Sequence, residues 1–498
     1  MCKTPKLSIQ VDNPYRSENN MGRVKRSYVC LRFEKQCRGQ AMEDLWNRRY
    51  MKKYDTYTGT FLMTDTTALN RLKRDDKELY DQVMWQHEGE SYLSALDGGD
   101  AISGNKARQL STKRKYSEKF GCDYNSLHMQ PPQFTMHRTS ECKAFFKWIQ
   151  DNPGEMWIRK PILGQGGVGI TLHSDVKDFD NLRDCSSKRD DNKYIIQHYI
   201  KHPLLIHGKK FDIRVYMLIA SSNPYFVFYH HGYLRRSIVG YNADSTDKGV
   251  FLTNTHFQSL EKGFELEDHI WGFERFQKYL ADNNIAGSQY VSTVLDSAIK
   301  KTLLYNFMSA KDELVRRKGS YHLFGLDFMI DSELRVHFIE ANGYPGFTWS
   351  PDFDTRTMVT ELFDLLHELH EKPTAFEGMT AGDMYGDFEL IYSELEDGCS
   401  EKTYDPCVDF ATFNQAPMGA KAARTGKIHD SGRRTKYRAR KTKVMGAKAA
   451  QAICEEKKIS PSSKECSKLM KKERLRLYEP VFEEQDAWET INQFVKGM

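Results

Sequence analysis

The clearest pattern along the chain is a run of alternating apolar and polar residues over positions 211–220. Successive residues of a β-strand point to opposite faces of a sheet, so this alternation predicts a strand. One face would carry Phe211, Ile213, Val215, Met217 and Ile219, and the other would carry Asp212, Arg214 and Tyr216. The strand therefore combines an apolar face with a face that carries charge.

Shorter segments rich in β-branched and aromatic residues predict further strands over residues 156–160, 170–172, 194–199, 324–330 and 335–342. Apolar residues at helical spacing predict helices over residues 291–308 and 357–371. The second helix would pack through a stripe formed by Met358, Leu362, Leu365, Leu366 and Leu369. We therefore expect an α+β fold with mixed or antiparallel sheets and a core domain over residues 106–375.

The regions on either side of this core differ from it. Residues 1–105 are mixed and polar, and we expect them to be partly ordered. Residues 376–498 are acidic and then basic, and we expect this extension to be largely disordered. A six-residue sequence at 418–423 recurs at 445–450, but two copies are too few for a repeat fold.

The composition is that of an ordinary soluble globular protein, since 39% of the 498 residues are hydrophobic and 28% are charged. The N-terminus has no apolar leader and no segment approaches a membrane span, so we expect neither secretion nor membrane insertion. The 10 cysteines form no Cys-x-x-Cys pair, and we expect reduced thiols in a cytosolic protein.

A glycine-rich loop at residues 164–169 matches the pattern Gly-x-Gly-x-x-Gly. A dinucleotide site needs such a loop to open a helix, whereas here a strand follows. A protein kinase places the loop between strands, but the chain has no His-Arg-Asp catalytic loop. A surface hairpin is the plain alternative. Lys160, just ahead of the loop, favours a phosphate cradle because an ammonium would add to the backbone N–H donors.

Two predicted strands form a hairpin that carries oxygen ligands. Asp327 lies in the first strand, and Glu340 and Asn342 lie two residues apart in the return strand. A strand points such residues to one face, and an antiparallel partner can place Asp327 opposite them. Carboxylate oxygens together with phosphate and water suit Mg²⁺. A capped or solvent-facing aspartate remains the alternative for Asp327 taken alone.

The charged face of the strand over 211–220 has polar neighbours in the sequence. Lys210 precedes it, Arg235 follows in the next predicted strand, and Thr253 and Asn254 add small polar groups. A cleft lined by such residues suits phosphoryl transfer onto a carboxylate, because the developing charge needs cations. A solvated sheet face is the alternative.

Taken together, these segments resemble the tubulin–tyrosine ligase-like family, a branch of the ATP-grasp fold. The resemblance covers about residues 110–375 and is carried by residues 157–161, 165–170, 197–206, 208–216, 252–254 and 324–345. It implies an ATP-grasp fold with ATP held between two lobes, and ATP and Mg²⁺ as cofactors.

The resemblance implies nucleotide-binding roles for residues that match the family's motifs. Lys160 and Lys210 would hold the phosphates of ATP under a flap that contains Gly166, Gly167 and Gly169. The adenine hinge would consist of Gln197, His198, Tyr199 and Ile200. Asp212 would meet the ribose or phosphate side of the nucleotide, and Thr253 and Asn254 would contact the nucleotide or the amino acid.

The same resemblance implies the catalytic residues. Arg214 and Arg235 would hold the carboxylates of the acyl phosphate and the incoming amino acid, with Lys210 beside them. Asp327, Glu340 and Asn342 would bind Mg²⁺. The sequence departs from the family at Val168, where a basic residue is usual. That change removes a cation from the phosphate flap.

The implied function is an ATP-dependent carboxylate–amine ligase that joins an amino acid to glutamates of tubulin tails through an acyl phosphate. Residues 223–233 and 270–279 look most like the polyglycylating member, so glycine is the expected amino acid, with glutamate next. An impaired tubulin-binding scaffold and a ligase for another acidic protein remain alternatives. The implied location is the cytoplasm and cytoskeleton, including the axoneme of a cilium or flagellum.

The densest run of positive charge lies at residues 433–443, within the basic segment 418–475. A solvated tail and a nuclear-localisation patch are the plain interpretations. Docking to acidic tubulin tails by long-range attraction is the functional one. Non-specific contact with nucleic acid is a further alternative, but we expect no specific nucleic-acid partner.

Overall fold

The fold is taken from a computed structural model. It describes residues 98–410, apart from 165–166, 186–192, 260, 262, 318–319, 344, 347–349, 372–375 and 396–404, together with residues 77 and 96 and four short strands before residue 95. The predicted basic segment 418–475, its duplicated sequence, and Gly166 of the glycine loop lie outside the described residues.

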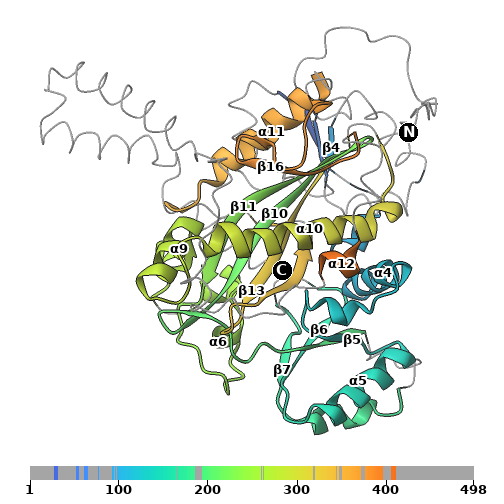
Figure 1. The fold of residues 1–498 in the computed structure, drawn as a ribbon, viewed down its shortest axis with the longest axis vertical. Coiled ribbons are helices and arrows are strands. Elements are labelled where there is room, and N and C mark those ends of the chain that lie inside the picture. The colour runs from blue at the N-terminus through green and yellow to red at the C-terminus, as the bar shows by residue number, and fades with distance from the viewer. Residues whose placement is uncertain are drawn as a thin grey trace, which may run out of the picture. The chain divides into compact units, whose positions relative to one another are not determined.

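An eight-stranded antiparallel sheet, the central sheet, is the largest sheet among the described residues (Figure 1). Its main path runs β14-β13-β10-β11-β16-β15, with β9 beside β10 and β12 beside β11. The strands are β9 (Leu205–Ile206), β10 (Lys209–Ser222), β11 (Tyr225–Arg236), β12 (Ile270–Trp271), β13 (His322–Ile330), β14 (Val336–Asn342), β15 (Met384–Tyr385) and β16 (Phe388–Ser393).

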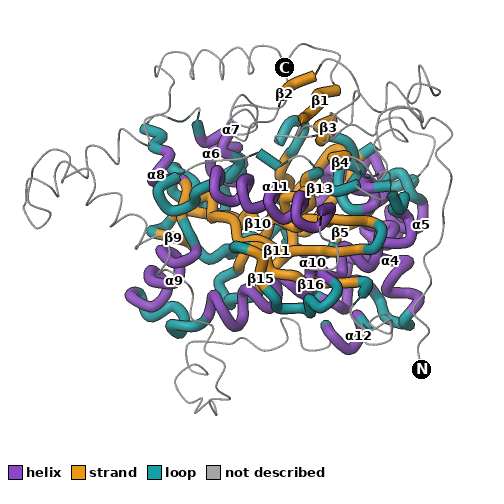
Figure 2. The backbone as a smooth tube through the Cα atoms, turned by 90° about the horizontal axis from the view of Figure 1, so that it is seen from above, coloured by secondary structure: helices purple, strands orange, loops and turns teal. Residues whose placement is uncertain are grey.

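Helices cover both faces of this sheet, which explains why β10 is buried on both sides. Its residues Phe211, Ile213, Val215, Met217 and Ile219 join one core with α9 (Phe273–Asp282) and α10 (Asp296–Ala310). Tyr216, Leu218 and Ala220 join a second core with α11 (Thr355–Glu371). Figure 1 shows α10 crossing the sheet, and Figure 2 shows its strands among the helices.

A second, four-stranded antiparallel sheet has the order β5-β8-β6-β7. Its strands are β5 (Gln133–Thr135), β6 (Trp157–Pro161), β7 (Thr171–His173) and β8 (Tyr194–His198). The helix α5 (Thr139–Asp151) packs on it through an aromatic core that contains Phe145 and Trp157. The glycine loop joins β6 to β7, as the sequence predicts.

The remaining described elements are short, apart from α4. Four parallel strands in the order β2-β1-β3-β4 lie within the N-terminal region, namely β1 (Ser27–Leu31), β2 (Lys52–Tyr54), β3 (Phe61–Thr64) and β4 (Tyr92–Ser94). The helices are α4 (Lys106–Lys119), α6 (Lys248–Phe251), α7 (Thr255–Gln258), α8 (Leu266–His269) and α12 (Pro406–Asp409). A π-helical turn over Val291–Leu295 leads into α10.

The structure confirms the α+β class and each strand and helix predicted for the core. All five residues of the predicted apolar stripe on α11 are buried against the sheet. One boundary differs, because β16 belongs to the central sheet although we expected the C-terminal extension to begin at residue 376. Among the described helices, none has the length and apolar character that crossing a bilayer requires.

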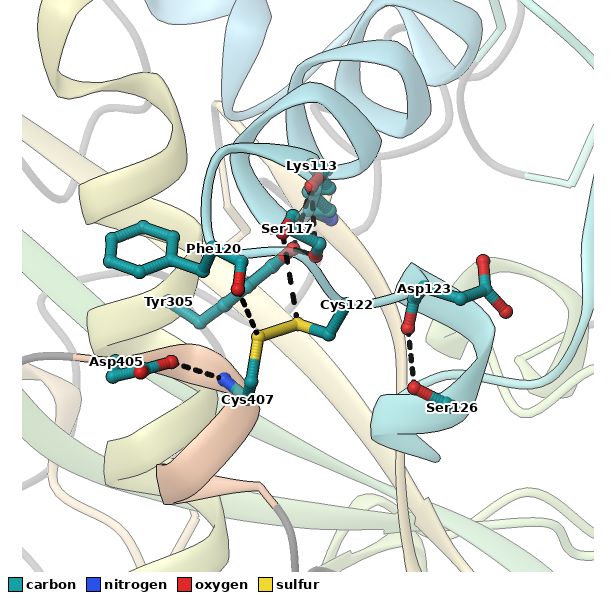
Figure 3. The surroundings of a disulfide bond; sticks show 9 residues. All are labelled: Lys113, Ser117, Phe120, Cys122, Asp123, Ser126, Tyr305, Asp405 and Cys407. Atoms are coloured by element: carbon teal, nitrogen blue, oxygen red, sulfur yellow. Dashed lines mark hydrogen bonds between the residues drawn. A yellow bond between two sulfur atoms is a disulfide. The ribbon is translucent and has the colours of Figure 1, made fainter.

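The expectation of reduced thiols is wrong for four cysteines, because the fold brings them together in pairs. Cys122 follows α4 and is bonded to Cys407 of α12 (Figure 3), and Cys142 is bonded to Cys185. The partners are 285 and 43 residues apart in the sequence. Spacing on that scale carries no pairing signal, so only the tertiary structure could identify them.

We expect Leu366→Ala to lower the free energy of unfolding by about 2–5 kcal/mol, because the Leu366 side chain is fully buried between α11 and the sheet and truncation leaves a cavity. Chemical denaturation measures the change. Asp364→Ala, at an exposed position on the same helix, is the control and should shift stability by no more than about 0.5 kcal/mol. Equal losses in both variants would show that α11 is not packed through this face.

Candidate active site

Two buried lysines lie on strands of the two sheets. On β6, the Nζ atom of Lys160 donates to Oε1 of Gln197 at 2.7 Å. On β10, the Nζ atom of Lys210 donates to the carbonyl oxygen of Phe251 at 2.9 Å and to the hydroxyl of Tyr199 at 3.1 Å. Within the described chain, neither lysine forms an ion pair. Each ammonium is therefore held by neutral acceptors.

Burial changes the titration of both lysines. Removal from water lowers the pKa of Lys160 to about 8, although the charge of Glu340 opposes the change. The same effect lowers the pKa of Lys210 to about 7. A buried ammonium without a carboxylate partner is stabilised by any anion that enters the site. The two lysines are thus suited to bind a phosphate chain.

Beside them, two arginines and two aspartates form a buried network across three adjacent strands. Asp212 lies opposite Arg235 in the β10–β11 register, and Arg214 lies opposite Asp327 in the β10–β13 register. Arg235 donates from Nε to Oδ1 of Asp212 at 2.8 Å and from Nη2 to Oδ2 of Asp327 at 2.9 Å. Arg214 donates from Nε to Oδ1 of Asp327 at 2.5 Å.

This network holds Asp327 ionised. Burial acts to raise the pKa of its carboxyl, but the charges and hydrogen bonds of Arg214 and Arg235 outweigh burial and lower the pKa. Buried charges are tolerated only when they are paired and hydrogen-bonded in this way. In this structure the two arginines, expected to hold substrate carboxylates, are bound to aspartates of the protein.

A fourth strand, β14, brings Glu340 and Asn342 to the same place. Glu340 lies opposite Asp327 in the β13–β14 register, as the predicted hairpin requires. Asn342 donates from Nδ2 to Oδ2 of Asp327 at 3.2 Å. Among the described residues, Glu340 has no hydrogen-bond or ion-pair partner, and its side chain lines a cavity of about 350 Å³.

The donor set fits a divalent cation. Oδ2 of Asp327 already accepts three hydrogen bonds, from Arg214, Arg235 and Asn342, whereas Oδ1 accepts only one. A carboxylate oxygen has two lone pairs in its plane, so Oδ1 retains capacity for a ligand bond. The unpaired carboxylate of Glu340 is the second donor. Hard oxygen donors of this kind suit Mg²⁺.

The described part of the glycine loop packs against the segment between β11 and α8. Gly167 and Gly169 have φ angles of +78° and +73°, which side-chain-bearing residues rarely adopt. A Cβ atom at Gly167 would lie 2.6 Å from Cε2 of Phe257, so only glycine fits there. Val168 is 72% exposed at the tip. The departure from the family therefore faces solvent.

The residues predicted to form the adenine hinge lie in two places. The backbone N–H of His198 donates to Pro132, and that of Tyr199 donates to Met156, both at 2.8 Å. His198, Tyr199 and Ile200 line a second cavity of about 870 Å³, which shares no lining residue with the first. Gln197 instead binds Lys160. Asn254 lines the first cavity, and the neighbouring Thr253 is buried.

The sequence did not single out two further residues of the first cavity, Lys106 and Gln109 of α4. The Nζ atom of Lys106 donates to the carbonyl oxygen of Gly164 at 3.3 Å and so links the helix to the glycine loop. Asn105 caps this helix by accepting from the N–H of Arg108 at 3.0 Å. The cap predicts a helix start, but nothing local connects that helix to the loop 58 residues later.

Comparison with known proteins identifies the family. The sequence profile described as the tubulin-tyrosine ligase family matches residues 75–374. The chain belongs to the tubulin–tyrosine ligase family. The match contains every strand that carries the lysines, the arginine–aspartate network and Glu340.

Curated members of this family show where the chain is similar. Protein polyglycylase TTLL10 of Mus musculus is 32% identical over 283 residues, which is 53% of this chain and 40% of that protein. Inactive polyglycylase TTLL10 of Homo sapiens is 30% identical over 234 residues, 43% of this chain and 34% of that protein. Probable tubulin polyglutamylase TTLL9 of Mus musculus is 27% identical over 335 residues, 59% of this chain and 71% of that protein.

These similarities establish a ligase family without choosing its amino acid. The chain spans between about a third and a half of the length of the TTLL10 polyglycylases that it matches. The names of the relatives include both glycylases and a glutamylase. Membership of the family therefore does not identify an amino acid substrate for this chain.

We expect Asp212→Ala to lower the free energy of unfolding by about 3–5 kcal/mol, because Arg235 loses one of its two buried carboxylate partners. Asp282→Ala is the control, since it breaks the exposed pair with Lys278 and should cost less than about 1 kcal/mol. Denaturant titration of both variants measures the difference. Similar costs would show that the network adds no more than a surface ion pair.

Proposed function

We propose that this protein is an ATP-dependent ligase that attaches an amino acid to glutamate side chains of an acidic protein tail. Glycine is the favoured amino acid, and tubulin is the favoured acceptor. The observation that carries the proposal is the cavity of about 350 Å³ in which Arg214, Asn254 and the unpaired Glu340 meet the glycine loop. The buried Lys160 on β6 and the buried Lys210 on β10 would supply cations for the phosphates.

The chemistry that fits this site has two steps. In the first, an oxygen of the acceptor carboxylate attacks the γ-phosphorus of ATP, the bond to the β–γ bridging oxygen breaks, and ADP leaves. In the second, the amine of the amino acid attacks the acyl carbon, an amide bond forms, and phosphate leaves with the oxygen it received. The amine releases a proton to solvent. The protein contributes positioning and charge rather than a covalent intermediate.

The charge and position of each residue indicate its proposed role in these steps. Lys160 and Lys210 would bind the phosphate chain between the two sheets, with the backbone of the glycine loop above it. Arg214 and Arg235 would hold the substrate carboxylates, each exchanging part of its contact with an aspartate for the ligand. Glu340, Asn342 and Oδ1 of Asp327 would hold Mg²⁺, which neutralises phosphate charge when bound.

Glycine is favoured over glutamate by the polyglycylases among the relatives and by the segments over 223–233 and 270–279 that resemble the polyglycylating member. Glutamate is the second candidate because the chain is also similar to a probable polyglutamylase. The acceptor has a second candidate too. The TTLL10 relatives of rat, mouse and macaque are named protein polyglycylases, which leaves room for an acidic protein other than tubulin.

A catalytically impaired tubulin-binding scaffold is supported by two observations. The human TTLL10 relative is named an inactive polyglycylase, and Val168 replaces the usual basic residue of the loop. Against it, both lysines, both arginines and Glu340 are present and brought together. An acceptor on microtubules would place the protein in the cytoplasm on the cytoskeleton, and in the axoneme where a cilium or flagellum is present.

We expect Glu340→Gln to abolish ligation. The carboxylate of Glu340 has no partner among the described residues and is proposed to bind the cation, and a neutral amide would be a weaker ligand. The assay incubates the protein with ATP, Mg²⁺, tubulin and isotopically labelled glycine, glutamate or tyrosine, and reads the adduct by mass spectrometry. The control is Glu118→Gln, at an exposed position of α4 that lines neither cavity, and this variant should retain wild-type turnover.

Incorporation of glycine by the wild-type protein supports the proposal, and incorporation of glutamate selects the second candidate. Binding of tubulin without incorporation of any amino acid selects the scaffold. Wild-type turnover by Glu340→Gln contradicts the proposed metal site.

We expect ATP binding at pH 8 to take up between about one and two protons, because phosphates raise the pKa of ammonium groups that are partly or mostly neutral in the free protein. At pH 6 both lysines are already protonated, so their uptake disappears. Calorimetry in buffers of different ionisation enthalpy measures the proton count. Lys210→Met should remove most of one proton from the uptake at pH 8, and an unchanged count would exclude Lys210 from the phosphate site.

A further inference from the structure

A second cluster of metal-ligating groups lies outside the candidate active site. His230 comes from β11, Glu361 from α11, and Asp387 from the turn between β15 and β16. One potential ligand atom from each lies within 4.8 Å of the others. None of the three lines either of the two cavities described above. Segments far apart in the sequence therefore converge on one point beside the second core.

His230 is set up as a metal ligand by its surroundings. Its side chain is only 5% exposed, and Nδ1 lies against the carbonyl oxygen of His231. That contact assigns the ring proton to Nδ1 and leaves the lone pair on Nε2, which has no hydrogen-bond partner among the described residues. A neutral imidazole with an available lone pair on one ring nitrogen is the form of histidine that binds a metal.

The turn between β15 and β16 packs closely against the side chain of Glu361. Oε2 of Glu361 accepts a hydrogen bond from the backbone N–H of Asp387 at 2.8 Å. Gly386 has a φ angle of +59°, and a Cβ atom there would lie 2.5 Å from Cδ of Glu361. Only glycine lets the backbone approach so near, and this approach brings the Asp387 side chain to the carboxylate of Glu361.

The charges at this point are not balanced by the protein. The carboxylates of Glu361 and Asp387 each have an oxygen within 4.8 Å of one on the other, where two negative charges repel. No lysine or arginine among the described residues forms an ion pair with Glu361 or Asp387. A bound cation would relieve this repulsion. It would also supply the missing partner of the buried imidazole.

We propose that His230, Glu361 and Asp387 bind a zinc ion that fastens the β15–β16 hairpin to β11 and α11. One imidazole nitrogen and two carboxylate oxygens are ligands that zinc accepts at about 2.0–2.2 Å, with water completing a tetrahedron at the exposed side of Asp387. Mg²⁺ and Ca²⁺ prefer sites made only of oxygen. The site holds together the C-terminal part of the central sheet, and it does not depend on the proposed ligase activity.

The test uses the full-length protein, stripped with a chelator and re-incubated with Zn²⁺. Elemental mass spectrometry gives the stoichiometry, competition with a chromophoric chelator gives the affinity, and thermal unfolding gives the effect on stability. We expect a zinc ion whose binding raises the Tm by about 3–6 °C at saturating Zn²⁺. Glu361→Gln and Asp387→Asn should each weaken this binding at least about tenfold.

Asp364→Asn is the matched control, because Asp364 is on the same helix and near the cluster but is not one of its three members. It should bind zinc with an affinity close to that of the wild-type protein. His230→Gln should also lose the ion, but burial of this position could impair folding, so the two carboxylate variants decide the outcome. Loss of zinc in both, with retention in the control, supports the site.

Absence of zinc binding by the wild-type protein overturns the proposal, and so does binding that neither carboxylate variant weakens. A preference for Mg²⁺ over Zn²⁺ at the same residues overturns the assignment of the metal. The ligation assay distinguishes this failure from failure of the proposed function, because the three residues lie outside the cavity that contains Glu340.

Discussion

The buried ion-pair network of Asp212, Arg214, Arg235 and Asp327 is the interaction on which the rest of the site depends. It connects three neighbouring strands, β10, β11 and β13, through residues that lie directly opposite one another in register. A network of this kind is costly to desolvate and is stable only when nearly every donor and acceptor is used. The register of these strands is therefore tied to the geometry of the site, because a slip of one residue would place the charges on the opposite face.

The network pairs some of the charged side chains at the site and leaves others unpaired. Asp212 and Asp327 are paired with arginines, whereas Glu340, Lys160 and Lys210 have no charged partner among the described residues. Lys160 and Lys210 are buried and Glu340 is half-buried, and an unpaired charge in such a position carries a free-energy cost that a ligand of opposite charge can remove. A nucleotide with its cation supplies both signs of charge at once, which is why the unpaired lysines and the unpaired carboxylate are consistent with one ligand rather than two.

The C-terminal strands show how the second core is completed. Without β16, the central sheet would end at β11, and the backbone groups on that edge would lack partners. The strand contributes Phe388 and Leu390 to the core beneath α11. The sequence did not reveal it, because β16 is short and follows a polar segment in which few apolar residues recur at a regular interval. Its pairing with β11 spans more than 150 residues and is a property of the whole sheet.

The sequence alone determined the local elements and the candidate chemistry. The alternation of apolar and polar residues predicted the two faces of β10, and helical spacing predicted the apolar stripe of α11. The two-residue spacing of Glu340 and Asn342 predicted that both lie on one face of a strand, with Asp327 opposite. These features depend on neighbouring residues, so periodicity is enough to predict them. Only the tertiary structure decided which charges pair, that Lys106 reaches the glycine loop, and that His230, Glu361 and Asp387 meet. Those contacts join segments separated by tens to hundreds of residues, and the packing of the whole chain, rather than any local pattern, brings them together.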